Sequence, residues 1–362
     1  MVMKLYSKLQ HDTSYKVVQL DDTILAAVKN GEPLQFKSMD ETQSEVVLCS
    51  SNATWRLKQK NHSNCVMVMK RDTSSNLEDE SEFCSLNDTT YEYELTKVPG
   101  SLNYHLIPLY DGEELSFKTT FKELLANSQC SNEEAMCEWH DIGGCILESG
   151  NICKLSDKFI TRALDITLVS IMADSLDMSH LDLDEVLKSV RKDSETVKDN
   201  PFTKPVIETI LNKFGTQEKD HKWHIDKKRI TYWYGLETLK KFAMGISKEQ
   251  QYPLNQEEFL IKWKSQMPPY FPNSDLDIRE LRGHYYLDRH TDEIHYIDKK
   301  SLPGDIKQRL VYLFKLQSQW NPDEMAPLMQ DLNQKNTKFE SFIIKYARIK
   351  RLSSKQKVVI QR

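Results

Sequence analysis

The sequence predicts an α+β protein, with a strand-rich N-terminal domain followed by repeated helical units. Two observations lead to this prediction. Over about the first 111 residues, short runs rich in Val, Leu, Trp and Phe are separated by Asp, Asn and Ser, which is typical of strands and turns. From Phe117 onward the apolar spacing becomes helical, and the order helix, helix, helix, strand pair recurs. The chain therefore divides into two regions of different secondary structure.

The bulk composition indicates an intracellular protein without a membrane span. The chain has 362 residues, 28% of them charged, and a net charge of -5, which is ordinary for a soluble protein. No apolar run approaches 18 residues, and the N-terminus lacks the apolar core of a signal peptide. Seven cysteines show no framework spacing, so reduced thiols in the cytosol or nucleus are expected.

The N-terminal domain is predicted to span residues 1–111. A short helix over residues 21–31 precedes four strands, which are "PLQFKSM", "SEVVLCS", "ATWRLKQK" and "NCVMVMK". An acidic stretch with few apolar residues follows, so a mobile loop is expected over about residues 72–90. "YEYELTKV" and "LNYHLIPLY" then predict two more strands. Such a meander has open edges, which must close, pair or be covered.

The repeated units have the element order of a winged helix, in which a β-hairpin follows the third helix of a helix-turn-helix. A short version is predicted over residues 117–156. Three full units follow at 157–227, 228–300 and 304–362. The alternative is a generic α+β array whose hairpins only cover helix ends. In the last unit, Pro327 should kink the second helix because proline cannot donate to the carbonyl of residue 323.

The last unit concentrates positive charge. Residues 341–362 contain seven Lys and Arg residues and no Asp or Glu, although the whole chain is acidic. A helix over residues 339–351 would place Phe339, Phe342, Ile343 and Tyr346 on one face. Lys345, Arg348 and Arg351 would recur on the opposite face, and a strand "KVVIQ" would form the wing. The predicted DNA-binding residues are Lys345, Arg348, Lys350, Arg351, Lys355, Lys357 and Arg362, because such groups neutralise phosphates.

Three other interpretations of this basic segment stay open. Lys and Arg near a helix C-terminus also stabilise the helix dipole. The run "RIKRLSSKQK" fits a nuclear import signal. The segment could also bind an acidic partner protein.

Residues suited to catalysis or to metal binding form no convincing pattern. The sequence lacks GxGxxG and GxxxxGK[ST] loops, which lowers the expectation of an ATPase or a dehydrogenase. Several cysteines and histidines lie near one another in the sequence: Cys130, Cys137, His140, Cys145 and Cys153, then His221 and His224, then His284, His290 and His295. Tight CxxC pairs are missing, so buried thiols and solvated histidines are expected instead of zinc ligands. No catalytic residue, metal or cofactor is predicted, and a nuclease is an unfavoured alternative.

Several blocks resemble the Dcc family, the "defective in sister chromatid cohesion" subunits of an alternative clamp loader, and budding-yeast members in particular. The blocks are "SEVVLCS", "TWRLKQ", "EWHDIGG", "IETILNKF", "EEFLIKWKS", "LRGHYY", "LFKLQSQW" and "SFIIKYARIKRL". The resemblance runs from about residue 15 to the C-terminus. The acidic stretch between residues 72 and 96 carries little of it.

This resemblance implies a non-enzymatic subunit of a replication factor C-like complex that loads or unloads the sliding clamp PCNA in the nucleus. The N-terminal strands would form a composite β-barrel with the small cohesion subunit and the C-terminal tail of the large AAA+ subunit. The winged helices would bind single- and double-stranded DNA and help the complex dock on the catalytic subunit of DNA polymerase epsilon. The alternative is a tandem winged-helix interaction scaffold that does not bind DNA directly.

Overall fold

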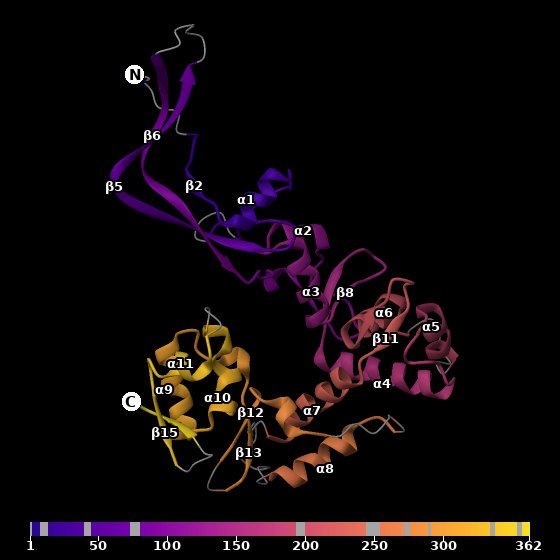
Figure 1. Ribbon diagram of the computed structural model, residues 1–362. Coiled ribbons are helices and arrows are strands. Elements are labelled where there is room, and N and C mark those ends of the chain that lie inside the picture. Colours follow the sequence, from indigo (N-terminus) through magenta and orange to yellow (C-terminus); the bar gives the residue numbers. More distant parts are fainter. Residues whose placement is uncertain are drawn as a thin grey trace. The chain divides into compact units, whose positions relative to one another are not determined.

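The computed structural model describes residues 2–7, 14–39, 45–72, 80–192, 200–243, 254–269, 271, 276–288, 291–333, 337–352 and 357–362. They form a mixed α+β chain with several small sheets (Figure 1). The chain divides into two compact units, Met1–Leu164 with Arg191–Lys213, and Asp165–Val190 with Phe214–Arg362. No helix within the described ranges is long and apolar enough to cross a bilayer.

The first unit begins with a six-stranded sheet in the order β1-β6-β5-β4-β3, with β2 also paired to β6. Its strands are β1 (Val2–Ser7), β2 (Val18–Gln19), β3 (Gln35–Lys37), β4 (Val47–Cys49), β5 (Thr54–Asp72) and β6 (Glu80–Val98). Figure 1 shows β5 and β6 side by side as a long ribbon. The sheet does not close into a barrel within the described residues, and β3 forms one of its edges.

Helix α1 (Asp22–Lys29) covers one face of this sheet and was predicted from the sequence. Asp21 caps its first turn, with Oδ1 accepting from the Ile24 amide at 2.8 Å. Ile24 packs with Leu48 and Trp55 of the sheet, and Trp55 Nε1 donates to Asp21 Oδ2 at 2.9 Å. The N-cap residue therefore also anchors the helix to the strands.

Three predictions for the N-terminal region differ from the structure. "ATWRLKQK" and "NCVMVMK" belong to one strand, β5, whose register shifts between Asn61 and Val66. Where an acidic loop was expected over about residues 72–90, β6 is already formed from Glu80 onward, and residues 73–79 lie outside the described part. "LNYHLIPLY" forms a 3-10 helix, η1 (Tyr104–Leu106), and a strand of two residues, β7 (Leu109–Tyr110), which belongs to another sheet.

The rest of the first unit is built around two capped helices and a small sheet. The helices are α2 (Phe121–Ala126) and α3 (Asn132–Ile142), and the sheet contains β7, β8 (Gly144–Ile146) and β9 (Ile152–Leu155). Thr120 and Ser131 begin the helices with complete capping boxes. Helices α4 (Asp157–Ala173) and α6 (Lys204–Phe214) each begin in the first unit and continue into the second.

The second unit continues with alternating helices and hairpins. Its helical elements are α5 (Leu183–Lys192, whose last two residues count with the first unit), α7 (Lys227–Ala243), α8 (Gln256–Gln266), η2 (Ile278–Leu281), η3 (Lys299–Ser301), α9 (Ile306–Leu316), α10 (Pro322–Met329), η4 (Gln330–Leu332) and α11 (Phe339–Ile343). Its strands are β10 (Gly215–Gln217), β11 (Trp223–Ile225), β12 (Tyr285–Leu287), β13 (Ile294–Tyr296), β14 (Gln319–Trp320), β15 (Arg348–Arg351) and β16 (Lys357–Ile360). Where the third helix of the predicted unit 228–300 was expected, between α8 and β12, the described residues form only the 3-10 helix η2.

One pairing pattern recurs three times in this unit. In each case the segment just before α5, α8 or α10 forms a β-bridge with the hairpin that follows. The bridge is made to the last strand of that hairpin (β11, β13 or β16) or to the residue before that strand. The pairs are Leu181 with Trp223, Asn255 with Glu293, and Gln319–Trp320 with Val359–Ile360. Only the last becomes a named three-stranded sheet, in the order β14-β16-β15.

Candidate nucleic-acid interface

The basic C-terminal segment forms a hairpin, so the helix predicted over residues 339–351 is confirmed only as far as Ile343 and is wrong beyond it. Helix α11 ends at Ile343, and the amide of Ala347 bonds to the Ile343 carbonyl at 2.9 Å as the chain turns. Residues Arg348–Arg351 then pair antiparallel with β16 over four residues. Ile349 packs against the buried core of the C-terminal module, which contains the elements from α9 to β16. Pairing and burial of Ile349 hold "RIKR" in the extended state.

The strand pleat separates the predicted DNA-binding residues onto two faces. Side chains alternate along a strand, and residues directly opposite on neighbouring strands share a face. Arg351 lies opposite Lys357, on the face of Ile349 and Val359. Arg348 and Lys350 lie on the other face, opposite Ile360 and Val358. The expected single helical face of Lys345, Arg348 and Arg351 is therefore replaced by two groups of cations.

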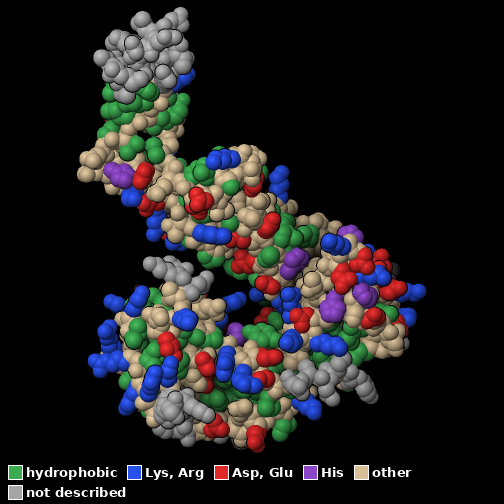
Figure 2. Space-filling view, in the orientation of Figure 1, with side chains coloured by type: hydrophobic (Ala, Val, Ile, Leu, Met, Phe, Trp, Pro, Cys, Tyr) green, Lys and Arg blue, Asp and Glu red, His purple; other side chains and the backbone are tan. Residues whose placement is uncertain are grey.

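Four of the predicted residues are exposed and carry no ion pair within the described residues: Lys345, Arg348, Lys350 and Arg351. Lys357 Nζ donates to Glu340 Oε1 at 2.7 Å. Arg362 Nη1 donates to the Lys345 carbonyl at 3.0 Å, which ties residue 362 to the turn before β15. Lys355 lies outside the described residues. Figure 2 shows Lys and Arg side chains gathered on the side of the module that carries β15.

A buried arginine joins two helices of the C-terminal module, and the sequence did not predict it. Arg309 is 4% exposed, and its guanidinium forms two bonds to Asp331, at 2.5 and 2.8 Å. It also donates to the carbonyls of Pro303 at 2.7 Å and Leu328 at 2.8 Å. These bonds join the start of α9 to the end of α10. The sequence offered one signal for the burial of Arg309, namely its position beside the apolar Leu310 on an amphipathic helix.

The arrangement is suited to binding phosphates. Exposed cations on a strand and the preceding turn can follow a nucleic-acid backbone without reading bases. The surface therefore favours sequence-independent contact.

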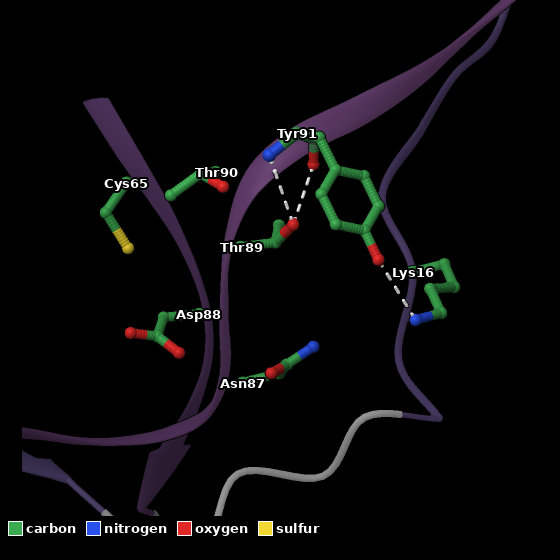
Figure 3. Close-up of a pocket in the computed structure, with 7 residues that line it drawn as sticks. All are labelled: Lys16, Cys65, Asn87, Asp88, Thr89, Thr90 and Tyr91. Carbon is green, nitrogen blue, oxygen red and sulfur yellow. Dashed lines mark hydrogen bonds between the residues drawn. The ribbon is translucent and has the colours of Figure 1, made fainter. Parts of the chain in front are cut away.

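A polar pocket of about 220 Å³ lies on the β5–β6 ribbon (Figure 3). It is lined by Lys16, Cys65 and the segment Asn87–Tyr91, beside the register shift of β5. Lys16 Nζ donates to the Tyr91 hydroxyl at 3.2 Å, and Thr89 Oγ1 accepts from the Tyr91 amide at 3.2 Å. With one ammonium and one carboxylate, Asp88, the pocket lacks a convergent acid–base pair.

The cysteines considered as zinc ligands lie mainly in cores. Cys145 and Cys153 lie opposite each other on β8 and β9 and are buried, as expected for apolar positions. The hydrogen bond to Cys145, together with burial, raises the pKa of Cys153. Burial also raises the pKa of the Cys130 thiol to about 12. No group of three or more possible ligands gathers among the residues that the structure describes.

The histidines considered in the sequence are dispersed as well. His284 stands just before β12 and packs against Tyr232 with ring centroids 6.0 Å apart. Burial and nearby Lys299 and Lys240 lower the pKa of this imidazole. His295 stacks on Tyr286 at 4.9 Å. His290 lies outside the described residues.

Comparisons with known proteins agree with the resemblance seen in the sequence. The family model for sister chromatid cohesion protein Dcc1 matches residues 15–329. The chain is 40% identical over 385 residues to sister chromatid cohesion protein DCC1 of Saccharomyces cerevisiae, covering 98% of each chain. It is 24% identical over 361 residues to the Homo sapiens protein of the same name, covering 91% of this chain and 84% of that one. The chain belongs to the Dcc1 family of sister chromatid cohesion proteins.

Proposed function

We propose that this protein is a non-enzymatic, nuclear subunit of a replication factor C-like clamp loader that loads or unloads PCNA during DNA replication and sister chromatid cohesion. Family membership supports the cohesion role. The six-stranded sheet with an open edge supports assembly with the small cohesion subunit and the tail of the large AAA+ subunit, because partner strands add to free edges.

The C-terminal module is proposed to be a winged helix that binds DNA. Its order is α9, β14, α10, α11, β15, β16, and its sheet runs β14-β16-β15. A hairpin after the third helix and a strand between the first two helices support this assignment. The same pairing at Leu181–Trp223 and Asn255–Glu293 supports winged helices over 157–227 and 228–300. These units would help dock the complex on DNA polymerase epsilon.

The observation that carries the DNA proposal is the exposed group Lys345, Arg348, Lys350 and Arg351. The test is binding of the full chain to short single- and double-stranded DNA, measured by fluorescence anisotropy over a range of salt. Changing Lys345, Arg348 and Arg351 to Glu should weaken binding about 10- to 100-fold at low salt and reduce the salt slope by about 2 to 3.

The matched control carries the same charge change elsewhere. Lys118, Lys122 and Lys158 are exposed residues of the first unit, and their change to Glu should have little effect on DNA binding. Equal loss in both variants would mean that net charge, and not this surface, governs affinity. Unchanged affinity in the first variant would contradict the proposal.

A second candidate is a winged-helix scaffold that does not touch DNA. The division of the cations between two sheet faces and the pairing of Lys357 with Glu340 favour it. A flat dependence of binding on salt, or no binding by the wild-type chain at low salt, would support this candidate.

A further inference from the structure

Two like charges face each other at the end of the C-terminal hairpin. Arg351 of β15 and Lys357 of β16 are directly opposite across the antiparallel pair. Like charges at such positions repel and destabilise a sheet. They lie on the face of Ile349 and Val359, against which α11 also packs through Phe342 and Ile343. The fold therefore places two cations side by side on one face of the hairpin, and Lys357 contacts α11.

An acidic side chain of α11 bonds to one member of this pair. Glu340 Oε1 accepts from Lys357 Nζ at 2.7 Å. The side chains of Glu340 and Lys357 are 51% and 38% exposed, so water and other anions can reach the contact. An ion pair this exposed is weak, and a competing anion can replace its carboxylate.

We propose that Arg351 and Lys357 form an anion-binding slot that Glu340 fills in the free protein and that a nucleic-acid phosphate takes over on binding. This proposal rests on the proposed DNA binding, and it adds Glu340 as a residue that sets the affinity for DNA. A phosphate offers more acceptor oxygens and more negative charge than a carboxylate, so it can bond to both cations. By competing with the phosphate, Glu340 keeps binding to the nucleic-acid backbone weak and reversible.

The experiment compares Glu340→Gln with wild type in the full chain, using the same short duplex over a range of salt. The variant should bind about three- to tenfold more tightly at low salt, with a salt slope steeper by about 0.9, because one more cation becomes free for a phosphate. Glu280→Gln removes the same charge from an exposed position outside the C-terminal module and should change affinity less than twofold.

A second pair of variants tests whether the effect passes through the slot. Lys357→Gln should weaken DNA binding, and Glu340→Gln should add no gain in that background. A gain that persists without Lys357, or no gain at all while wild type binds DNA, would overturn the slot and leave the proposed DNA binding standing. Failure of wild type to bind DNA would instead remove the proposed function itself.

The identity of the anion has its own control. Polyglutamate offers carboxylates in place of phosphates. If Glu340→Gln improved binding to polyglutamate as much as to DNA, the assignment to a nucleic-acid phosphate would be wrong. Improvement for DNA alone would support it.

Discussion

At the scale of single residues, Glu134 holds together two elements of the first unit. Its Oε2 accepts from Thr54 Oγ1 of β5 at 2.6 Å and from Ser131 Oγ at 2.7 Å, while Oε1 accepts from the Gly100 amide at 3.1 Å. Burial raises the pKa of this carboxyl, but these hydrogen bonds outweigh burial and hold its pKa below the ordinary value of 4.5. The ionised form therefore stabilises the fold.

The sign of the resulting pH dependence is fixed by that lowered pKa. The stabilisation is fully present above about pH 4.5, and it is lost as pH falls from there through the folded-state pKa, because the unfolded state takes up the proton more readily than the folded state. We expect Glu134→Gln to lower the urea midpoint at pH 7 and to differ less from wild type as pH falls below 4.5. A difference that stays constant with pH would contradict this assignment. Glu133→Gln, at an exposed neighbouring position, is the control.

At the scale of elements, Gly283 lets the chain just before β12 pack closely against α10. Its φ is +91°, and an added Cβ would lie 2.9 Å from Cβ of Pro327. Pro327 lies inside α10, an eight-residue helix that is followed by the 3-10 helix η4. The proline that was predicted to kink this helix thus packs where glycine leaves room.

We expect Gly283→Ala to destabilise the protein by about 2 to 4 kcal/mol, since it adds a side chain in the left-handed region and a clash with a rigid ring. Gly31→Ala is the matched control. Its φ is +71° and no atom lies within 4 Å of its added Cβ, so only the backbone cost of about 1 kcal/mol applies. Equal losses in chemical denaturation would mean that Pro327 yields to the new methyl group.

The same scale shows which elements sequence patterns can predict. Helix α1 was predicted from its own residues, and α3, β8 and β9 fall within the short unit predicted over residues 117–156, because a helical period and short apolar strand runs are local patterns. The strand β15 was missed because Phe339, Phe342, Ile343 and Tyr346 continue a helical period past the true end of α11. Its extended state depends on pairing with β16, whose nearest paired residue, Lys357, lies six positions after Arg351, and such cross-strand contacts override local propensity.

The composition of the sequence therefore predicted which segment forms the candidate site, but it did not predict how the cations are arranged there. The segment and its cations follow from charge alone. The division onto two faces, and the role of Glu340, depend on register, which a shift of one residue would reverse. In β5, the polar run from Asn61 to Asn64 resembled a turn, yet the strand continues through it with a register shift.

At the scale of the whole molecule, the proposed assembly and nucleic-acid contacts fall in different compact units. The edge strand β3 presents Phe36 with 62% of its surface exposed. We expect Phe36→Glu in the full chain to lower co-purification with the small cohesion subunit and the large-subunit tail about tenfold, because a charge on an edge opposes strand pairing. DNA binding by the variant should be unchanged.

The control for assembly is Phe117→Glu. Phe117 is also exposed, at 41%, and lies outside the six-stranded sheet. Loss of co-purification in both variants would point to general damage of the first unit. Wild-type protein that does not co-purify would contradict the proposed composite barrel.

The central place of β16 bears on how the protein is made. The two outer strands of the last sheet, β14 and β15, bond to β16 and not to each other. Since β16 is the latest of the three to leave the ribosome, its sheet cannot assemble while only β14 and β15 have been synthesised. The equivalent contacts of Trp223 and Glu293 impose the same order on the earlier repeats. Translation thus completes the repeats one after another, each closed by its own final strand.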